Sequence, residues 1–189
     1  MMLRQALVTV ALAAAAGAAS AQALYIGGAG GVTRSNADCS GTVSCDNSDT
    51  GWKAYAGYHI NPLWSVEVLG YDMGGTSGVV ALPGIGLLNA SLKTRGFGLA
   101  TVINAPIGSV VDVLGRIGIG SNKLKVDAST GSLSGSDSET STQFLWGVGL
   151  AFKLSPNVAL RTEIDGTSAS YFGERFDSTL WSVGVSLRF

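Results

Sequence analysis

The stretch TQFLWGVGLAFKL, residues 142–154, alternates large apolar side chains with small or polar ones. One face carries Phe144, Trp146, Val148, Leu150, Phe152 and Leu154, and the other carries Gln143, Gly147, Gly149, Ala151 and Lys153, with Leu145 as the only interruption. Successive side chains of a β-strand point to opposite faces, so this period of two indicates a strand. One side of that strand is wholly apolar.

The C-terminus repeats the pattern. Trp181, Val183, Val185, Leu187 and Phe189 alternate with Ser182, Gly184, Ser186 and Arg188. We therefore predict a last strand that ends on an aromatic residue.

Extending this reading along the chain gives eight strands. We place them at residues 23–33, 51–60, 64–73, 91–104, 109–126, 141–154, 157–166 and 179–189. Three connections are short and contain turn residues, at 61–63, 104–108 and 155–157. Four are long and are expected to be loops, at 34–50, 74–90, 127–140 and 167–178. Short turns that alternate with long loops are typical of an up-and-down membrane barrel.

Glycine decides which face of the strands is inside. A soluble lipocalin-like barrel would place its large apolar residues inside, whereas a membrane barrel places them outside. The face opposite the large apolar residues is rich in Gly and Ala, for example Gly118, Gly120, Gly147 and Gly149. Such residues are too small to build an apolar interior, and the lumen of an eight-stranded barrel is just wide enough for side chains. The sequence therefore predicts an all-β, eight-stranded antiparallel up-and-down transmembrane β-barrel with two outward aromatic girdles.

Composition agrees with this class. The chain has 189 residues, 12 of them basic and 13 acidic, which argues against a nucleic-acid partner because that needs a dense basic face. Charged residues are only 13% of the chain and Gly accounts for 27 residues, which is unusual for a soluble enzyme. After residue 21 there is no apolar run long enough for a membrane-spanning helix.

The N-terminus has the three parts of a secretory signal peptide. Arg4 precedes an apolar stretch, residues 6–16, and Ala19-Ser20-Ala21 supplies the small residues of a cleavage site. We expect residues 1–21 to be removed before Gln22, which leaves residues 22–189 as one barrel domain in the outer membrane.

The chain resembles the small eight-stranded outer-membrane barrels of the OmpA transmembrane-domain, OmpX and opacity-protein superfamily. The resemblance rests on the signal peptide, on Asn61-Pro62-Leu63-Trp64-Ser65-Val66-Glu67-Val68, on Gly115-Arg116-Ile117-Gly118-Ile119-Gly120 and on the C-terminal alternation. It implies an outer-membrane location among lipid and lipopolysaccharide. It also implies insertion by the barrel assembly machinery, which would recognise Trp181, Val183, Val185, Leu187 and Phe189 as a C-terminal signal.

Strand parity sends several charges into the lumen. The predicted lumen charge network is Lys53, Glu67, Arg116, Arg161, Glu163 and Asp165, with Lys153 and Arg188 also facing inward. Buried charges are tolerated only when they are paired with an opposite charge or hydrated. Two readings stay open, a salt-bridge network that plugs the barrel and a gate whose ion pairs exchange partners.

The cysteine and histidine residues give little support for a metal site or for catalysis. Cys39 and Cys45 are the only cysteines, and an exported chain is expected to join them in a loop disulfide. A zinc site would need more ligands than these two, and His59 is the only histidine. His59 lies beside a short turn and is expected to be a lumen-filling or turn-packing residue rather than a catalytic one. We therefore predict neither an enzyme nor a cofactor.

Two functions remain open. The first is a mostly closed barrel with membrane-structural roles and adhesion-like interactions through loops 34–50, 74–90, 127–140 and 167–178. The second is a small pore, or an OmpW-like conduit for ions or apolar compounds, which would need large apolar residues facing inward. Tyr55, Leu69, Leu114 and Leu145 are the inward candidates, and the apolar segment 79–88 would be the mouth of such a conduit.

Overall fold

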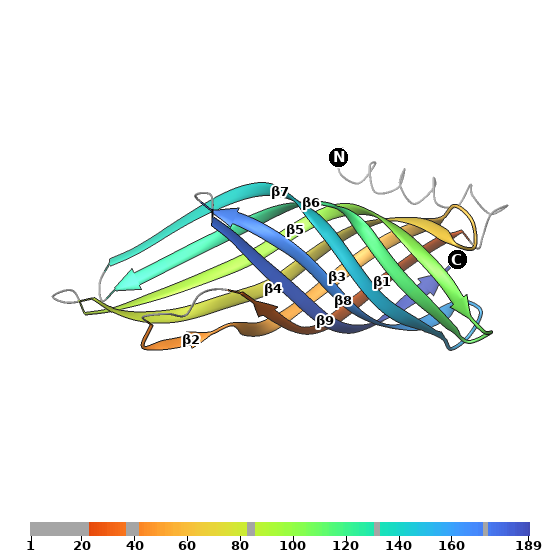
Figure 1. The fold of residues 1–189 in the computed structure, drawn as a ribbon, viewed down its shortest axis with the longest axis horizontal. Helices are drawn as coiled ribbons and strands as arrows, with labels where there is room; N and C mark the ends of the chain where they lie inside the picture. Colours follow the sequence, from red (N-terminus) through yellow and green to blue (C-terminus); the bar gives the residue numbers. More distant parts are fainter. Residues whose placement is uncertain (1–22, 37–41, 83–85, 131–132, 172–173) are drawn as a thin grey trace, which may run out of the picture.

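Nine β-strands make up most of the computed structural model, which describes residues 23–36, 42–82, 86–130, 133–171 and 174–189 (Figure 1). The strands are β1 (Leu24–Ser35), β2 (Ser44–Asp46), β3 (Ser48–His59), β4 (Trp64–Leu82), β5 (Gly86–Ile107), β6 (Val111–Thr130), β7 (Leu133–Lys153), β8 (Val158–Tyr171) and β9 (Glu174–Arg188). Across these ranges no helix is long and apolar enough to cross a membrane.

Eight of these strands close into a ring. The order is β4-β3-β1-β9-β8-β7-β6-β5, and β5 pairs back to β4. Every pairing in the ring is antiparallel, and β1 joins β9 from Tyr25↔Arg188 to Ser35↔Ser178. The short β2 lies outside this ring order and, within the described residues, pairs with the far part of β4 alone. The predicted fold class, an eight-stranded up-and-down barrel, is confirmed.

The two ends of the barrel differ. The turn end holds the short connections around Asn61, Ser109 and Pro156, together with Leu24 and Phe189. The hairpin end holds the far ends of the other strand pairs, and β4 to β7 extend furthest in this direction (Figure 1).

The prediction of four long loops is largely wrong, because most of these residues continue the strands. β4 and β5 pair as far as Leu82↔Gly86, and β6 and β7 pair as far as Thr130↔Leu133. Residues 167–171 and 174–178 likewise extend β8 and β9. β6 has 20 residues, whereas a strand needs about 10 to cross the hydrocarbon layer. The barrel wall therefore continues well beyond the membrane.

The outer face carries the expected apolar band. Large side chains project outward and stay exposed, among them Phe97 at 70%, Trp181 at 57% and Ile119 at 61%. Aromatic residues gather at two levels of this band, with Tyr58, Trp64 and Phe189 near the turn end and Trp52, Phe97, Trp146 and Trp181 nearer the hairpin end. A band of exposed apolar residues between aromatic girdles is the surface that lipid requires.

The lumen holds more apolar side chains than the sequence suggested. Tyr55, Leu69, Leu114 and Leu145 are buried there as expected. The prediction missed further inward apolar residues, namely Tyr25, Tyr71, Met73, Val102, Leu124 and Leu180, all buried. All of these residues lie within the predicted strands, and Tyr71, Met73 and Leu124 share the parity of the inward Glu67 and Arg116. Strand alternation carried through to the strand ends therefore accounts for them.

Two predictions lie wholly or partly outside the described residues. The signal peptide, residues 1–21, is one of them. The other is the Cys39–Cys45 disulfide, because Cys39 lies outside the described residues while Cys45 lies in β2. Both stay predictions.

Candidate functional site

A layer of six charged side chains crosses the lumen within the membrane-spanning half of the barrel. β3 contributes Lys53, β4 Glu67, β6 Arg116, and β8 Arg161, Glu163 and Asp165. Alternation along each strand turns these residues inward, and each side chain is at most 6% exposed. Three cations face three anions, so the layer is formally neutral. We call it the charged layer.

Arg116 is the centre of the charged layer because it contacts all three carboxylates. Its Nη2 lies 2.6 Å from Oε2 of Glu67 and 3.1 Å from Oε1 of Glu163. Its Nε donates a second hydrogen bond of 2.9 Å to Glu67, and its Nη1 pairs with Asp165. One guanidinium thereby joins β4, β6 and β8 across the lumen.

The other two cations complete the layer. Arg161 bridges Oε1 of Glu67 at 3.0 Å and Oε1 of Glu163 at 2.6 Å. Lys53 Nζ lies 2.7 Å from Oε2 of Glu163 and also pairs with Asp165. Every carboxylate therefore has two or three cationic partners, which is the condition under which a buried charge is tolerated.

Two tyrosines, missed by the sequence analysis as site residues, support the charged layer. Tyr25 donates a 2.9 Å hydrogen bond to Oε1 of Glu67, and the guanidinium of Arg161 lies 4.5 Å from the ring centre of Tyr55. Each ring covers a glycine on the neighbouring strand: Tyr25 pairs with Gly57, and Gly27 pairs with Tyr55. The signal was present as Tyr-x-Gly in both strands, 25–27 and 55–57.

An apolar layer lies beside the charged layer on its hairpin side. It includes Leu69, Tyr71, Met73, Leu145 and Leu180, each at most 7% exposed. Asn122 lies beside it, fully buried, and its amide donates to Thr167 Oγ1 at 2.8 Å. The lumen is thus filled by side chains on two successive levels.

The turn end of the lumen is more open. A cavity of about 300 Å³ is lined there by residues that include His59, Asp112, Lys153 and Arg188. Lys153 pairs with Asp112 at 2.7 Å, and His59 Nε2 lies 3.2 Å from Arg188 Nη2. His59 also packs on the ring of Tyr25, with 4.6 Å between ring centres. These contacts make His59 a packing residue of this vestibule.

Near the hairpin end, polar contacts hold the β8–β9 wall. Ser168 donates a 2.6 Å hydrogen bond to Asp177, and Arg175 Nε lies 3.0 Å from the same carboxylate. The Ser168 hydrogen bond, and after it Arg175, lower the pKa of Asp177 below its usual value. The wall is therefore ordered by specific contacts beyond the apolar band.

A closed antiparallel ring of eight strands, apolar outside and polar at its centre, defines an integral outer-membrane β-barrel protein. Residues 5–189 match the profile of the family described as "Outer membrane protein beta-barrel domain", and the chain belongs to this family. The predicted location in the bacterial outer membrane is confirmed.

Known relatives agree with this assignment. The chain is 31% identical over 144 residues to outer membrane protein A of Salmonella typhi and 30% identical over 142 residues to that of Shigella flexneri, matching 72% of this chain in each case. The match spans 39% of the length of these curated relatives.

Solved structures share the fold. Neisserial surface protein A aligns with a TM-score of 0.61 at 17% identity, covering 88% of this chain and 97% of its own. OprG of Pseudomonas aeruginosa aligns at 0.58 with 16% identity, covering 89% and 96%. Ail, the attachment invasion locus protein of Yersinia pestis, aligns at 0.57 with 20% identity, covering 89% and 99%.

Proposed function

We propose that the protein is a closed barrel without enzymatic activity, which acts through the wall that it raises above the membrane. The charged layer carries this proposal, because it joins β3, β4, β6 and β8 across the lumen and leaves its side chains at most 6% exposed. A lumen filled in this way favours a plug over a gate. The apolar layer with Leu69 and Leu180 adds a second obstacle.

Conductance of the refolded barrel in a planar lipid bilayer tests the closure. We expect no discrete current steps from wild type, and none from Arg161→Ala or Glu67→Ala, because the apolar layer still blocks the lumen in both variants. Discrete steps that change between wild type and the variants would instead make the charges a gate and the protein a pore. A large porin reconstituted in the same membrane is the positive control.

A conduit for apolar compounds is the second candidate. It is favoured by the apolar residues that line the lumen on the hairpin side, among them Met73, Leu145 and Leu180. They are packed against one another in this structure, so transport would require them to move apart. Uptake of a small alkane by liposomes that contain the barrel, compared with empty liposomes, distinguishes the candidates: the closed barrel predicts equal rates.

The wall beyond the membrane is the surface we assign to adhesion-like contacts. β6 and β7 pair from Val126↔Asp137 up to Thr130↔Leu133 through residues rich in Ser, Gly and Asp. Ail, whose fold this chain shares, is named for attachment and invasion. We expect non-adherent bacteria that express the chain to bind epithelial cells, and a variant with residues 127–136 replaced by a two-residue turn to lose this binding. Equal adhesion with and without the segment would contradict the assignment.

A further inference from the structure

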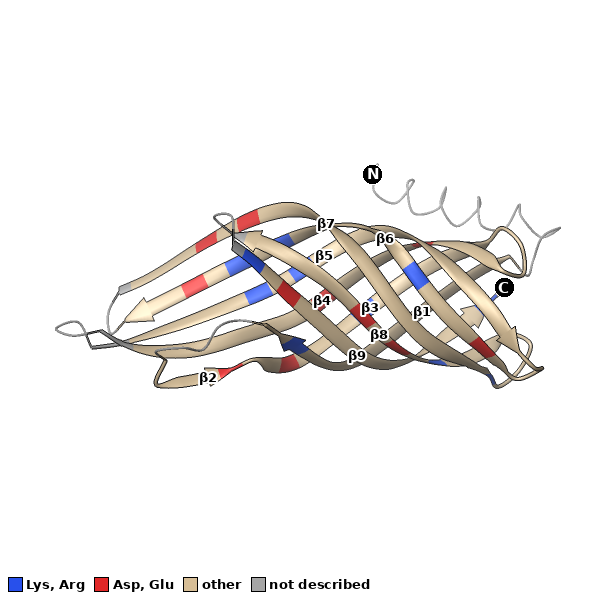
Figure 2. Ribbon diagram, in the orientation of Figure 1, with Lys and Arg blue, Asp and Glu red and all other residues tan. Residues whose placement is uncertain are grey.

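Four cations meet on the outer face of the wall, just beyond the hairpin-side girdle. Lys93 of β5 stands opposite Lys125 of β6, and Arg95 stands opposite Lys123. All four are exposed, while Thr94 and Leu124 between them are buried. The blue bands lie side by side on β5 and β6 in Figure 2. Like charges opposite one another destabilise a sheet unless an anion lies between them. We call these four residues the cationic patch.

Acidic neighbours neutralise only part of the cationic patch. Arg95 Nε pairs with Asp72 at 2.6 Å, and Lys125 Nζ pairs with Asp127 at 2.8 Å. Among the described carboxylates, none forms an ion pair with Lys93 or Lys123. Four cations and two paired acids leave a formal excess of two positive charges, which suits a ligand with two anionic groups.

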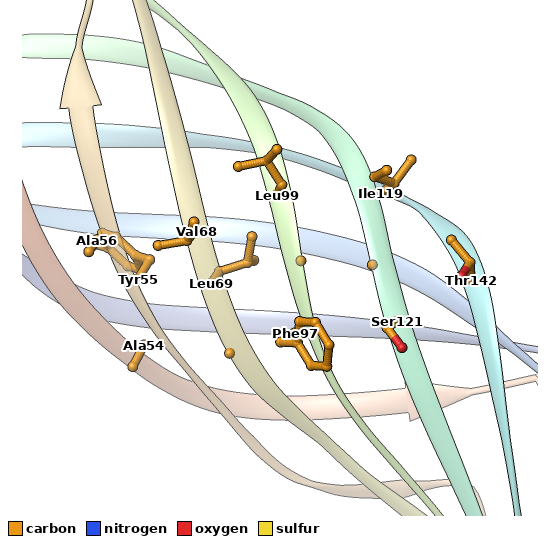
Figure 3. Close-up of a pocket in the computed structure, with 13 residues that line it drawn as sticks. Ala54, Tyr55, Ala56, Val68, Leu69, Phe97, Leu99, Ile119, Ser121 and Thr142 are labelled. Atoms are coloured by element: carbon orange, nitrogen blue, oxygen red, sulfur yellow. The ribbon is translucent and has the colours of Figure 1, made fainter. Parts of the chain in front are cut away.

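A hollow of about 760 Å³ opens in the lipid-facing wall next to the cationic patch (Figure 3). One row of paired residues crosses it, and apart from Phe97 these are small: Ala54, Gly70, Phe97, Ser121 and Thr142. Leu99 and Ile119 line it further toward the turn end.

The hollow and the cationic patch share their strands. Arg95 lies two residues from Phe97 on β5, and Lys123 lies two residues from Ser121 on β6. Two residues of a strand span roughly 7 Å. An acyl chain in the hollow would therefore bring the head group of its lipid directly onto the cationic patch.

We propose that this face binds a phosphorylated glycolipid with several acyl chains, the lipid A type of the outer leaflet. Its phosphates contact Lys93, Arg95, Lys123 and Lys125, and one acyl chain fills the hollow. The inference depends on the outer-membrane location and is independent of whether the lumen conducts.

Equilibrium binding of lipid A to the refolded protein in non-ionic micelles tests the site. The main variant is Lys93→Gln with Lys123→Gln, and Arg34→Gln is the matched control. Arg34 is also an exposed outer-face cation, but it stands on β1 opposite Ser48 and Thr179. Each cation near an anionic lipid surface strengthens binding about fivefold, so the double variant is expected to bind roughly 25-fold more weakly, and Arg34→Gln as wild type does.

A second variant probes the hollow. A Cβ added at Gly70 has no atom within 4 Å, so Gly70→Leu fills the hollow without a clash from its Cβ. It should weaken lipid A binding while the barrel keeps its folded mobility on an unheated gel. Removal of both phosphates from lipid A should weaken wild-type binding and leave the double lysine variant little changed.

Three results would overturn the proposal. The first is unchanged binding in the double lysine variant, and the second is an equal loss in Arg34→Gln, which would show attraction to any positive surface. The third is equal affinity for phosphatidylglycerol, which would remove the assignment to a glycolipid.

Discussion

Arg116→Ala is expected to lower the free energy of unfolding by about 3–5 kcal/mol, the cost of breaking a buried ion pair by removing one partner. Arg116 touches Glu67, Glu163 and Asp165. Without it, three buried carboxylates share the two remaining cations, and the layer carries a net negative charge in a lumen that excludes most water. Urea unfolding of the refolded barrel in lipid vesicles, followed by tryptophan fluorescence, measures the loss.

Lys153→Ala is the matched control. The Lys153 side chain is 35% exposed and pairs with Asp112 in the vestibule, so solvent screens the pair and its loss should cost less than about 1 kcal/mol. A charge-balanced double variant, Arg116→Met with Glu67→Gln, should be more stable than Arg116→Met alone, because it leaves the layer neutral. If Arg116→Ala and Lys153→Ala cost the same, the charged layer does not hold the strands together.

The sequence alone located the members of the charged layer but not its pairing. Alternation is a local property, so parity within one strand was enough to turn Arg116 or Glu163 inward. Which carboxylate meets which cation depends on the register between strands that are far apart in the chain. Arg116 and Glu67 are 49 residues apart and meet across the lumen rather than in neighbouring positions of one sheet.

The lengths of the strands follow less well from the sequence than their positions do. The composition of segment 127–140 predicts a loop, because Ser, Gly, Thr and Asp are typical of loops. However, β6 and β7 already pair within the membrane-spanning part of the barrel. Each further pair of residues continues the same register up to Thr130↔Leu133. Backbone pairing, rather than side-chain hydropathy, extends the hairpin. Met73 and Leu124 have a different explanation, because both lie inside the predicted strands and share the parity of Glu67 and Arg116. Alternation alone therefore places them in the lumen.

The cationic patch cannot be recognised in the sequence for a related reason. Lys93 and Lys125 are 32 positions apart in the sequence, and their opposition exists only in the register of β5 and β6. The net charge of the whole chain is close to zero, with 12 basic and 13 acidic residues. A local excess of charge on one face is compatible with that balance, because composition sums the whole chain and carries no information on where each charge lies.

Gly31→Ala is expected to destabilise the barrel by about 3 kcal/mol, the upper part of the range for overpacking. A Cβ at Gly31 would lie 1.8 Å from the carbonyl oxygen of Trp181, and a backbone atom cannot rotate away as a side chain can. Gly31 pairs with Ser182 in the contact between β1 and β9. That contact joins the first strand of the ring to the last, so the clash would weaken the strand pairing that closes the barrel.

Gly28→Ala, three residues earlier on β1, is the matched control and should change stability in the opposite direction. Its added Cβ meets only the carbonyl oxygen of Lys53, at an ordinary 3.6 Å, and Gly28 faces outward. Where the backbone fits, alanine in place of glycine stabilises a fold by about 0.4–1 kcal/mol because it restricts the unfolded chain. The two urea midpoints should therefore move apart, Gly31→Ala to lower and Gly28→Ala to slightly higher concentration. Equal midpoints would show that the β1–β9 contact can widen without cost, and closure of the ring would then not depend on the absence of a side chain at Gly31.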